Sequence, residues 1–171
     1  MKVAVFGLGY VGVVTAACLA ADGHDVLGID PNATKVDCVN RGLSPIVEAD
    51  VPELVAAARR SGRLAAVREL VGTDRAADVS LVCVGTPSAP NGSLDLRFVR
   101  NVCEQIGATL CRGSGYHVVV VRSTLLPGTM RDVVIPLLEA ASTDGGARFR
   151  CLHQSGVPQG RFRGPGLPAS A

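Results

Sequence analysis

A glycine-rich segment directly after the first apolar run constrains the fold of this chain more than any other feature. The run Lys2–Phe6 is short and rich in β-branched residues, as in a buried strand, and G-L-G-Y-V-G follows it at once. The glycines are Gly7, Gly9 and Gly12. The next segment, Tyr10–Ala21, is rich in valine and alanine and ends close to Gly23, as a helix does. Because glycine-rich turns are common, this strand–turn–helix context is what gives the G-x-G-x-x-G pattern its meaning.

The three glycines have different predicted roles at a bound dinucleotide. Gly7 permits a tight turn, Gly9 lets the backbone approach a pyrophosphate, and Gly12 allows the helix to pack close to the strand. The helix would direct its free N–H groups and the positive end of its dipole at the phosphates. The pattern therefore predicts a dinucleotide-binding unit.

Asp30 is a second, independent indication. It follows the apolar run Asp25–Ile29 and lies 18 positions after Gly12, close to the spacing of about 20 expected for an acid that binds a ribose. A carboxylate there accepts hydrogen bonds from ribose hydroxyls and repels a 2′-phosphate, so we expect NAD rather than NADP. The alternative role of Asp30 is the cap of the next helix, beside Asn32. The complete pattern favours the cofactor role.

The rest of the chain, up to about residue 150, alternates strand-like and helix-like segments. We expect strands at 64–67, 79–84, 118–121 and from 147 onward, and helices at 32–40, 51–60, 70–77, 96–110 and 127–141. Nearly unbroken apolar runs such as Val79–Val84 are typical of strands covered on both faces of a parallel sheet. This order predicts an α/β fold with a doubly wound parallel sheet, a Rossmann-like domain over residues 1–150.

Two further loops follow buried strands at the edge where such a sheet binds its ligand. C-V-G-T-P-S covers Cys83–Ser88, and R-S-T-L-L-P-G-T covers Arg122–Thr129. Ligands of doubly wound sheets lie outside the carboxyl ends of the strands, so we expect both loops to join the glycine-rich loop in one site. Ordinary turn and cap chemistry is the alternative for either loop alone.

Composition argues against several other classes of function. Hydrophobic residues make up 47% and charged residues 19%, which is typical of a globular domain. The net charge of +2 is too small to indicate nucleic acid or an anionic membrane as a main partner. No apolar stretch reaches the ~18 residues of a membrane span, and no secretory cleavage pattern is present, so we expect a cytoplasmic protein. The six cysteines form no C-x-x-C pair and the three histidines are scattered, so we expect no structural metal.

Four motifs carry a family resemblance: G-L-G-Y-V-G, S-P-I-V-E at Ser44–Glu48, V-C-V-G-T-P-S, and V-V-V-R-S-T-L-L-P-G-T. Together they resemble the N-terminal NAD-binding domain of the UDP-glucose/GDP-mannose 6-dehydrogenases, over about residues 1–150. The short segment Asn91–Leu96 is similar to the GDP-mannose branch, since the UDP-glucose branch has a longer insertion there. The resemblance implies an intact, homo-oligomeric enzyme that uses NAD to oxidise the sugar C6 hydroxyl of GDP-mannose, or of UDP-glucose, to a carboxylate.

The resemblance also implies roles for individual residues. Tyr10 and Val11 would contact the pyrophosphate, Asp30 and Lys35 the adenosine side, and Thr86 and Thr124 would approach the nicotinamide half. By spacing alone, Lys35 would be a solvated helix lysine. The candidate cofactor-binding residues are therefore Gly7, Gly9, Tyr10, Val11, Gly12, Asp30, Lys35, Thr86 and Thr124.

The family's covalent chemistry needs residues that these 171 positions do not contain. A cysteine in a G-G-S-C-L-P-K-D motif carries the intermediate as a thiohemiacetal and then a thioester, and a lysine precedes it on a long central helix. We therefore assign no catalytic residue and expect the chain to be inactive alone. One alternative is a stand-alone NAD-binding or interaction module with a basic tail. Another, less favoured, is a small complete oxidoreductase, for which no residue pair offers a convincing proton relay near the predicted nicotinamide.

The segment Cys151–Ala171 has a different character from everything before it. It is rich in glycine and proline and has no apolar period, so it suits neither strand nor helix. The family continues here with a segment like T-N-P-E-F-L-R-E-G. Permitted codons for Cys151–Arg161, read one base later, spell A-S-T-N-P-E-F-L-R-E. We expect an irregular tail produced by a shifted reading frame; a solvated basic linker with Arg161 and Arg163 is the alternative.

Overall fold

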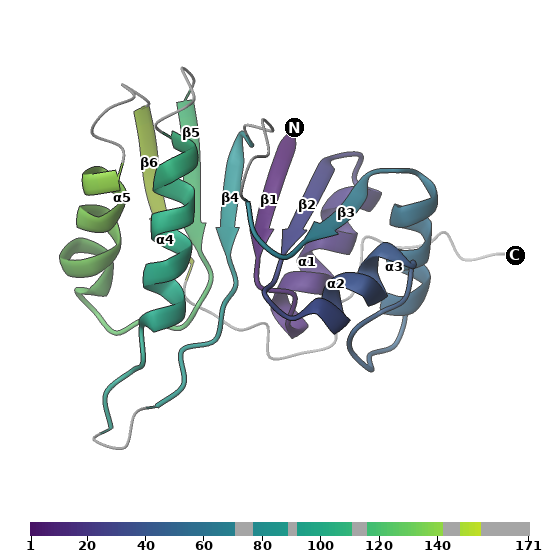
Figure 1. Cartoon of the computed structure of the whole chain (residues 1–171), viewed down its shortest axis with the longest axis horizontal. Helices are drawn as coiled ribbons and strands as arrows, with labels where there is room; N and C mark the ends of the chain where they lie inside the picture. Colours follow the sequence, from purple (N-terminus) through teal and green to yellow (C-terminus); the bar gives the residue numbers. More distant parts are fainter. Residues whose placement is uncertain (71–76, 89–91, 111–115, 142–147, 155–171) are drawn as a thin grey trace, which may run out of the picture.

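Parallel strands form one sheet in the computed structural model, which describes residues 1–70, 77–88, 92–110, 116–141 and 148–154 (Figure 1). The strands in these residues are β1 (Lys2–Phe6), β2 (Asp25–Ile29), β3 (Leu64–Val67), β4 (Val79–Val82), β5 (Tyr116–Val121) and β6 (Arg148–His153). Their spatial order is β3-β2-β1-β4-β5-β6, and every pair of neighbours is parallel. The chain moves outward from β1 to β3 and then returns to place β4 beside β1. This reversal confirms the predicted doubly wound, Rossmann-like α/β fold.

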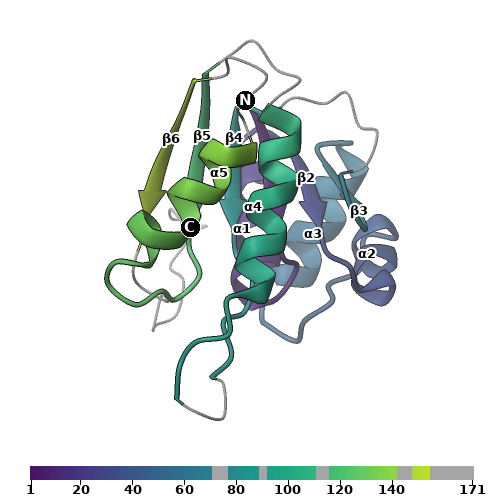
Figure 2. The same cartoon turned by 60° about the vertical axis from the view of Figure 1, so that its left-hand side comes forward.

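Helices cover both faces of the sheet. The helices α1 (Tyr10–Ala21), α2 (Ala33–Asn40) and α3 (Val51–Arg60) share one core, and α4 (Arg97–Leu110) and α5 (Ile135–Ala141) share the other (Figure 2). Successive side chains of a strand point to opposite faces, so β1 serves both cores. Val3 and Val5 pack on the α1 side, and Ala4 and Phe6 on the α4 side. None of the helices in the described ranges is long and apolar enough to cross a membrane.

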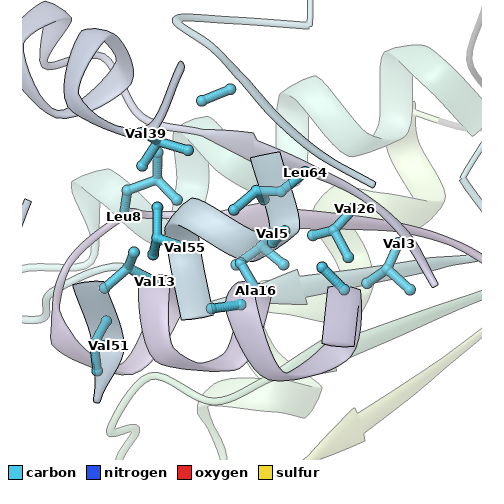
Figure 3. Packing of buried hydrophobic residues seen from close by; sticks show 14 of the residues in the cluster. Val3, Val5, Leu8, Val13, Ala16, Val26, Val39, Val51, Val55 and Leu64 are labelled. Atoms are coloured by element: carbon cyan, nitrogen blue, oxygen red, sulfur yellow. The ribbon is translucent and has the colours of Figure 1, made fainter. Parts of the chain in front are cut away.

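The core on the α1 side fixes the start of α1. Figure 3 shows Val5 of β1, Val13 and Ala16 of α1, and Leu64 of β3 within this cluster. All four side chains are fully buried. Because α1 is packed against the strands along this face, the turn between β1 and α1 has little freedom to move.

The helix predicted from Pro127 begins later than expected. Pro127 and Gly128 form a turn, in which the N–H of Thr129 donates to the carbonyl of Leu126 at 3.1 Å. Gly128 has φ 89°, which interrupts a right-handed helix. A π-helical stretch, Met130–Val134, then leads into α5. The predicted first turn at Pro127 is therefore wrong, and most of the helix predicted at 70–77 lies outside the described residues.

The last strand extends past the domain boundary that the sequence predicts after residue 150. β6 pairs with β5 as far as His153, opposite Val121, and the N–H of Gln154 donates to the carbonyl of Val121 at 3.0 Å. Backbone pairing of this kind does not depend on the side chains, so it tolerates the change in composition at Cys151. Residues 155–171, most of the predicted irregular tail, lie outside the described part of the chain.

Candidate functional site

The glycine-rich loop leaves no room for side chains at two of its three glycines. Gly7 has φ 94°, and its N–H donates to the carbonyl of Ile29 at 2.7 Å. A Cβ on Gly7 would lie 2.7 Å from the carbonyl oxygen of Cys83. A Cβ on Gly12 would overlap the carbonyl oxygen of Gly7. The tight turn and the close helix–strand packing expected of these two glycines are both present.

Gly9 has a different environment, because a Cβ there would meet nothing within 4 Å. It is the N-cap of α1 and has no side chain to bond the helix. The first bond into the helix runs from the N–H of Val13 to the carbonyl of Gly9, at 2.9 Å. Among the described residues, no acceptor is present for the N–H groups of Tyr10 and Val11, and the first turn contains no acidic residue. Open space beside free N–H groups at a positive helix end is suited to an anion.

Asp30 is a buried carboxylate that already accepts three hydrogen bonds. Its Oδ2 accepts from the N–H of Leu8 at 2.8 Å and from Nζ of Lys35 at 3.1 Å. Its Oδ1 accepts from the N–H of Asn32 at 3.0 Å. A carboxylate has about four acceptor positions, so one on Oδ1 remains for a ligand hydroxyl. The helix-capping alternative belongs to Asn32 instead, whose side chain accepts from the N–H of Thr34 at 3.0 Å.

The hydrogen bond from the N–H of Leu8 to Asp30 connects the glycine-rich loop to the end of β2, and no sequence pattern predicted this link. Gly28, where a Cβ would lie 2.7 Å from the Leu8 side chain, was also missed. An isolated glycine inside a strand often marks such a close approach, and this signal could have revealed it. Leu8 is fully buried, so the loop is anchored on both sides of the space beside Gly9.

The loops after β4 and β5 are joined by hydroxyl groups. Oγ1 of Thr86 donates to the carbonyl of Thr124 at 2.9 Å, and Oγ of the buried Ser123 donates to the carbonyl of Val84 at 2.6 Å. In Figure 1, β4 and β5 end at the same edge of the sheet, where these loops begin. The structure thus brings together Thr86 and Thr124, as predicted. Ser123 was not among the predicted residues, although it lies inside the quoted loop.

The glycine-rich loop adjoins the loop after β4. The N–H of Cys83 donates to the carbonyl of Phe6 at 2.8 Å. A Cβ on Gly12 would lie 3.5 Å from the Cys83 Cβ. The turn after β1, the first turn of α1 and the loop that contains Thr86 therefore meet where the strand order reverses, the usual ligand position in this fold.

A cavity of about 440 Å³ lies at the opposite, amino-terminal edge of the strands. Lys2, Asp78 and His117 are among the residues that line it. Leu70 and Ala77 also line it, and residues 71–76 between them lie outside the described part of the chain. The free N–H groups, Asp30 and the two threonines are all at the other edge, so we assign the candidate site there.

Four of the described thiols are poor nucleophiles. Burial raises the pKa of Cys83 and of Cys151 to about 11 each, and that of Cys103 to about 12. Burial also raises the pKa of Cys18. These thiols are protonated at neutral pH, and the thiolate is the reactive form. Within the described residues, no group of three or more His, Cys, Asp or Glu side chains could hold a metal ion.

Known proteins resemble this chain in both sequence and fold. The NAD binding domain of the UDP-glucose/GDP-mannose dehydrogenase family matches residues 1–154. The GDP-mannose 6-dehydrogenase of Pseudomonas aeruginosa is 49% identical over 142 residues, which are 83% of this chain and 33% of that protein. The UDP-glucose 6-dehydrogenase AglM of Haloferax volcanii is 38% identical over 146 residues, again 83% of this chain and 33% of that protein.

A solved ternary complex of GDP-mannose dehydrogenase from Pseudomonas aeruginosa has a TM-score of 0.83 at 47% identity. The match covers 88% of this chain and 35% of that one. The chain thus spans about a third of the length of the relatives it matches. It belongs to the UDP-glucose/GDP-mannose dehydrogenase family and contains the family's NAD-binding domain.

Proposed function

We propose that this chain is the NAD-binding part of a nucleotide-sugar 6-dehydrogenase that acts on GDP-mannose. The observation that carries the proposal is the open first turn of α1, with its free N–H groups and the open space beside Gly9, near the buried carboxylate of Asp30. Relatives named GDP-mannose 6-dehydrogenase are 48–49% identical, and those named UDP-glucose 6-dehydrogenase are 38–39% identical. This difference favours GDP-mannose over UDP-glucose as the sugar nucleotide.

In this proposal the backbone binds the phosphates and Asp30 binds the adenosine ribose. The N–H groups of Tyr10 and Val11 donate to the pyrophosphate, which approaches through the space beside Gly9. The remaining acceptor position on Oδ1 of Asp30 receives a ribose hydroxyl. Gly7 and Gly12 contribute by the turn and the packing that hold the first turn of α1 in place.

Lys35 adjusts the charge at the ribose end of the site. Its ammonium lies 3.1 Å from Asp30 and about a third of its side chain is exposed. The ammonium offsets part of the carboxylate charge, so Asp30 repels a 2′-phosphate less strongly than an unpaired carboxylate would. In this proposal Asp30 accepts from the ribose hydroxyl that a 2′-phosphate would replace, and its remaining negative charge disfavours a phosphate there, so we expect NAD rather than NADP.

The nicotinamide half would lie toward the joined loops after β4 and β5. Thr86 and Thr124 are held there by the hydrogen bond between them, with Thr124 exposed. When bound, NAD supplies the hydride acceptor for oxidation at C6. This chain contributes one wall of the nicotinamide site, so we expect weaker binding than in an intact enzyme.

We further propose that the 171-residue polypeptide does not oxidise the sugar by itself. The route through a thioester needs an activated thiol, and the four thiols described above have raised pKa values. The test is to incubate the purified polypeptide with GDP-mannose and NAD and to follow NADH by absorbance, with an intact family member as the positive control. Formation of two NADH per GDP-mannose by this polypeptide would contradict the proposal.

Cofactor preference is tested by titration calorimetry of the polypeptide with NAD and, separately, with NADP. We expect weak saturable binding of NAD and weaker binding of NADP. Tighter binding of NADP than of NAD would contradict the role of Asp30. Absence of any binding to either dinucleotide would contradict the proposed cofactor site as a whole.

A further inference from the structure

Arg122 directly follows β5, and its side chain reaches α1, the helix that follows β1. In the sheet, β4 lies between β5 and β1. Nη1 of Arg122 donates to Oγ1 of Thr15 at 2.7 Å, and the same hydroxyl donates to the carbonyl of Val11 at 2.6 Å. The backbone of Arg122 is fixed as well, because its N–H donates to the carbonyl of Val82 at 2.8 Å. These bonds connect the ends of β4 and β5 with the first turn of α1, across 107 residues of sequence.

The guanidinium is half-buried, and no described carboxylate lies within ion-pair distance of it. The ion pairs among the described residues use other cations, namely Lys35, Arg63, Arg97 and Arg131. The positive charge of Arg122 affects its neighbour Cys83. Burial raises the pKa of the Cys83 thiol, and the Arg122 charge lowers it by a smaller amount. Keeping a cation partly out of water is unfavourable unless a negatively charged group offsets its charge.

The position of this charge points to the phosphate site. Thr15 follows Val11 by four residues, so the two lie about 6 Å apart along the helix axis. The free N–H groups of Tyr10 and Val11 are therefore within about one helical turn of the atoms that Arg122 contacts. A bound pyrophosphate there would supply the negative charge that the described residues do not provide.

We propose that Arg122 is a positioning residue for the cofactor pyrophosphate. It holds the first turn of α1 through Thr15, and its charge favours an anion at the free N–H groups of that turn. The inference rests on the proposed dinucleotide site. It adds a determinant of phosphate affinity that lies directly after β5 rather than in the glycine-rich loop.

Three variants separate the charge of Arg122 from its contact with Thr15. Arg122→Met removes the charge. Arg122→Lys keeps the charge but replaces the planar guanidinium by an ammonium group. Thr15→Val keeps the charge of Arg122 and removes the hydroxyl that bridges it to the carbonyl of Val11. The ligands are ADP-ribose, which contains the pyrophosphate, and adenosine, which lacks it and serves as the matched control. Binding is measured by NMR titration at two salt concentrations, after circular dichroism has shown that each variant is folded.

Arg122→Met should weaken ADP-ribose binding by about tenfold, the size of one partly screened charge interaction, and should reduce its salt dependence. Thr15→Val and Arg122→Lys should each weaken it a few-fold, and adenosine binding should be unchanged in all three. Unchanged ADP-ribose binding by Arg122→Met, or an equal loss for adenosine, would overturn the inference.

If Arg122→Met does not fold, Thr15→Val decides: the inference requires weaker binding of ADP-ribose with unchanged binding of adenosine. Unchanged binding of both ligands by folded Thr15→Val would then overturn it. Failure of the unmutated chain to bind ADP-ribose would contradict the proposed function, and the inference with it.

Discussion

Alanine substitution should mainly reduce stability at Gly12 and mainly reduce cofactor affinity at Gly9, although both residues belong to the same short motif. At Gly12 the new Cβ overlaps the carbonyl oxygen of Gly7 and lies 2.9 Å from the carbonyl carbon. These are backbone atoms of a turn that is held by the bond from Gly7 to Ile29, so no side-chain rotation relieves the overlap. At Gly9 the new Cβ meets no protein atom within 4 Å, and the φ of −80° suits alanine.

The expected magnitudes follow from this difference in space. Overpacking a well-packed site costs about 1–3 kcal/mol, and overlap with backbone places Gly12→Ala at the upper end, about 3 kcal/mol. One kcal/mol corresponds to about 2–4 °C in Tm for a domain of this size, so Tm should fall by about 6–12 °C. Gly9→Ala replaces the N-cap glycine of α1 by alanine, a less favourable N-cap residue, and should lower the free energy of unfolding by less than about 1 kcal/mol. Its Cβ fills the space proposed for the pyrophosphate, so NAD affinity should fall at least about tenfold, which is about 1.4 kcal/mol.

Thermal unfolding followed by circular dichroism, together with NAD titration by calorimetry, measures both effects in the two variants and the unmutated chain. Gly9→Ala is the matched control for Gly12→Ala in stability, because it adds the same methyl group three residues away. Equal losses of Tm in the two variants would refute the packing argument. So would a Gly12→Ala variant that melts at the temperature of the unmutated chain.

Three further predictions concern the ribose end of the site and the end of the chain. Asp30→Ala should weaken NAD binding and reduce the preference over NADP; because it leaves the buried N–H of Leu8 without its acceptor, it should also cost about 1–3 kcal/mol in unfolding experiments. Unchanged Tm and unchanged cofactor preference would contradict both roles. Lys35→Met should lower NADP affinity a few-fold more than NAD affinity, since it removes the ammonium beside Asp30, and a fall in NAD affinity alone would contradict this. We propose that residues 151–171 come from a shifted reading frame. Resequencing the gene across the codons of residues 149–151 should show that the reading frame one base later encodes T-N-P-E-F-L-R-E. An offset frame that lacks this segment, or that reaches a stop codon at once, would rule the proposal out.

Much of the fold and part of the site could be predicted because their signals are local. The turn after β1 depends on three glycines within six positions, and the apolar runs of β1, β2 and β4 mark buried strands by composition alone. Parallel strands also predict that the Thr86 and Thr124 loops share an edge, which the structure confirms.

The missed features depend on how distant segments meet. The bond from Leu8 to Asp30 spans 22 positions and the bond from Arg122 to Thr15 spans 107, and neither has a local pattern. Predicting either bond requires knowledge of the strand order and of how side chains are oriented across neighbouring strands. The late start of the helix after Pro127 was missed for another reason, since the positive φ of Gly128 overrides the preference of proline for a first helical turn.

We propose that NAD binds at the first turn of α1 beside Asp30, and an NMR titration of the ¹⁵N-labelled chain with NAD is the sharpest test of this placement. We expect the largest amide shifts at Gly9, Tyr10, Val11 and Asn32, which surround the free N–H groups and the Asp30 carboxylate. Residues at the opposite edge of the sheet should remain unshifted. The placement would be wrong if the largest shifts occurred at Lys2, Asp78 and His117, which line the cavity at that edge, while the amides of Tyr10 and Val11 remained unchanged.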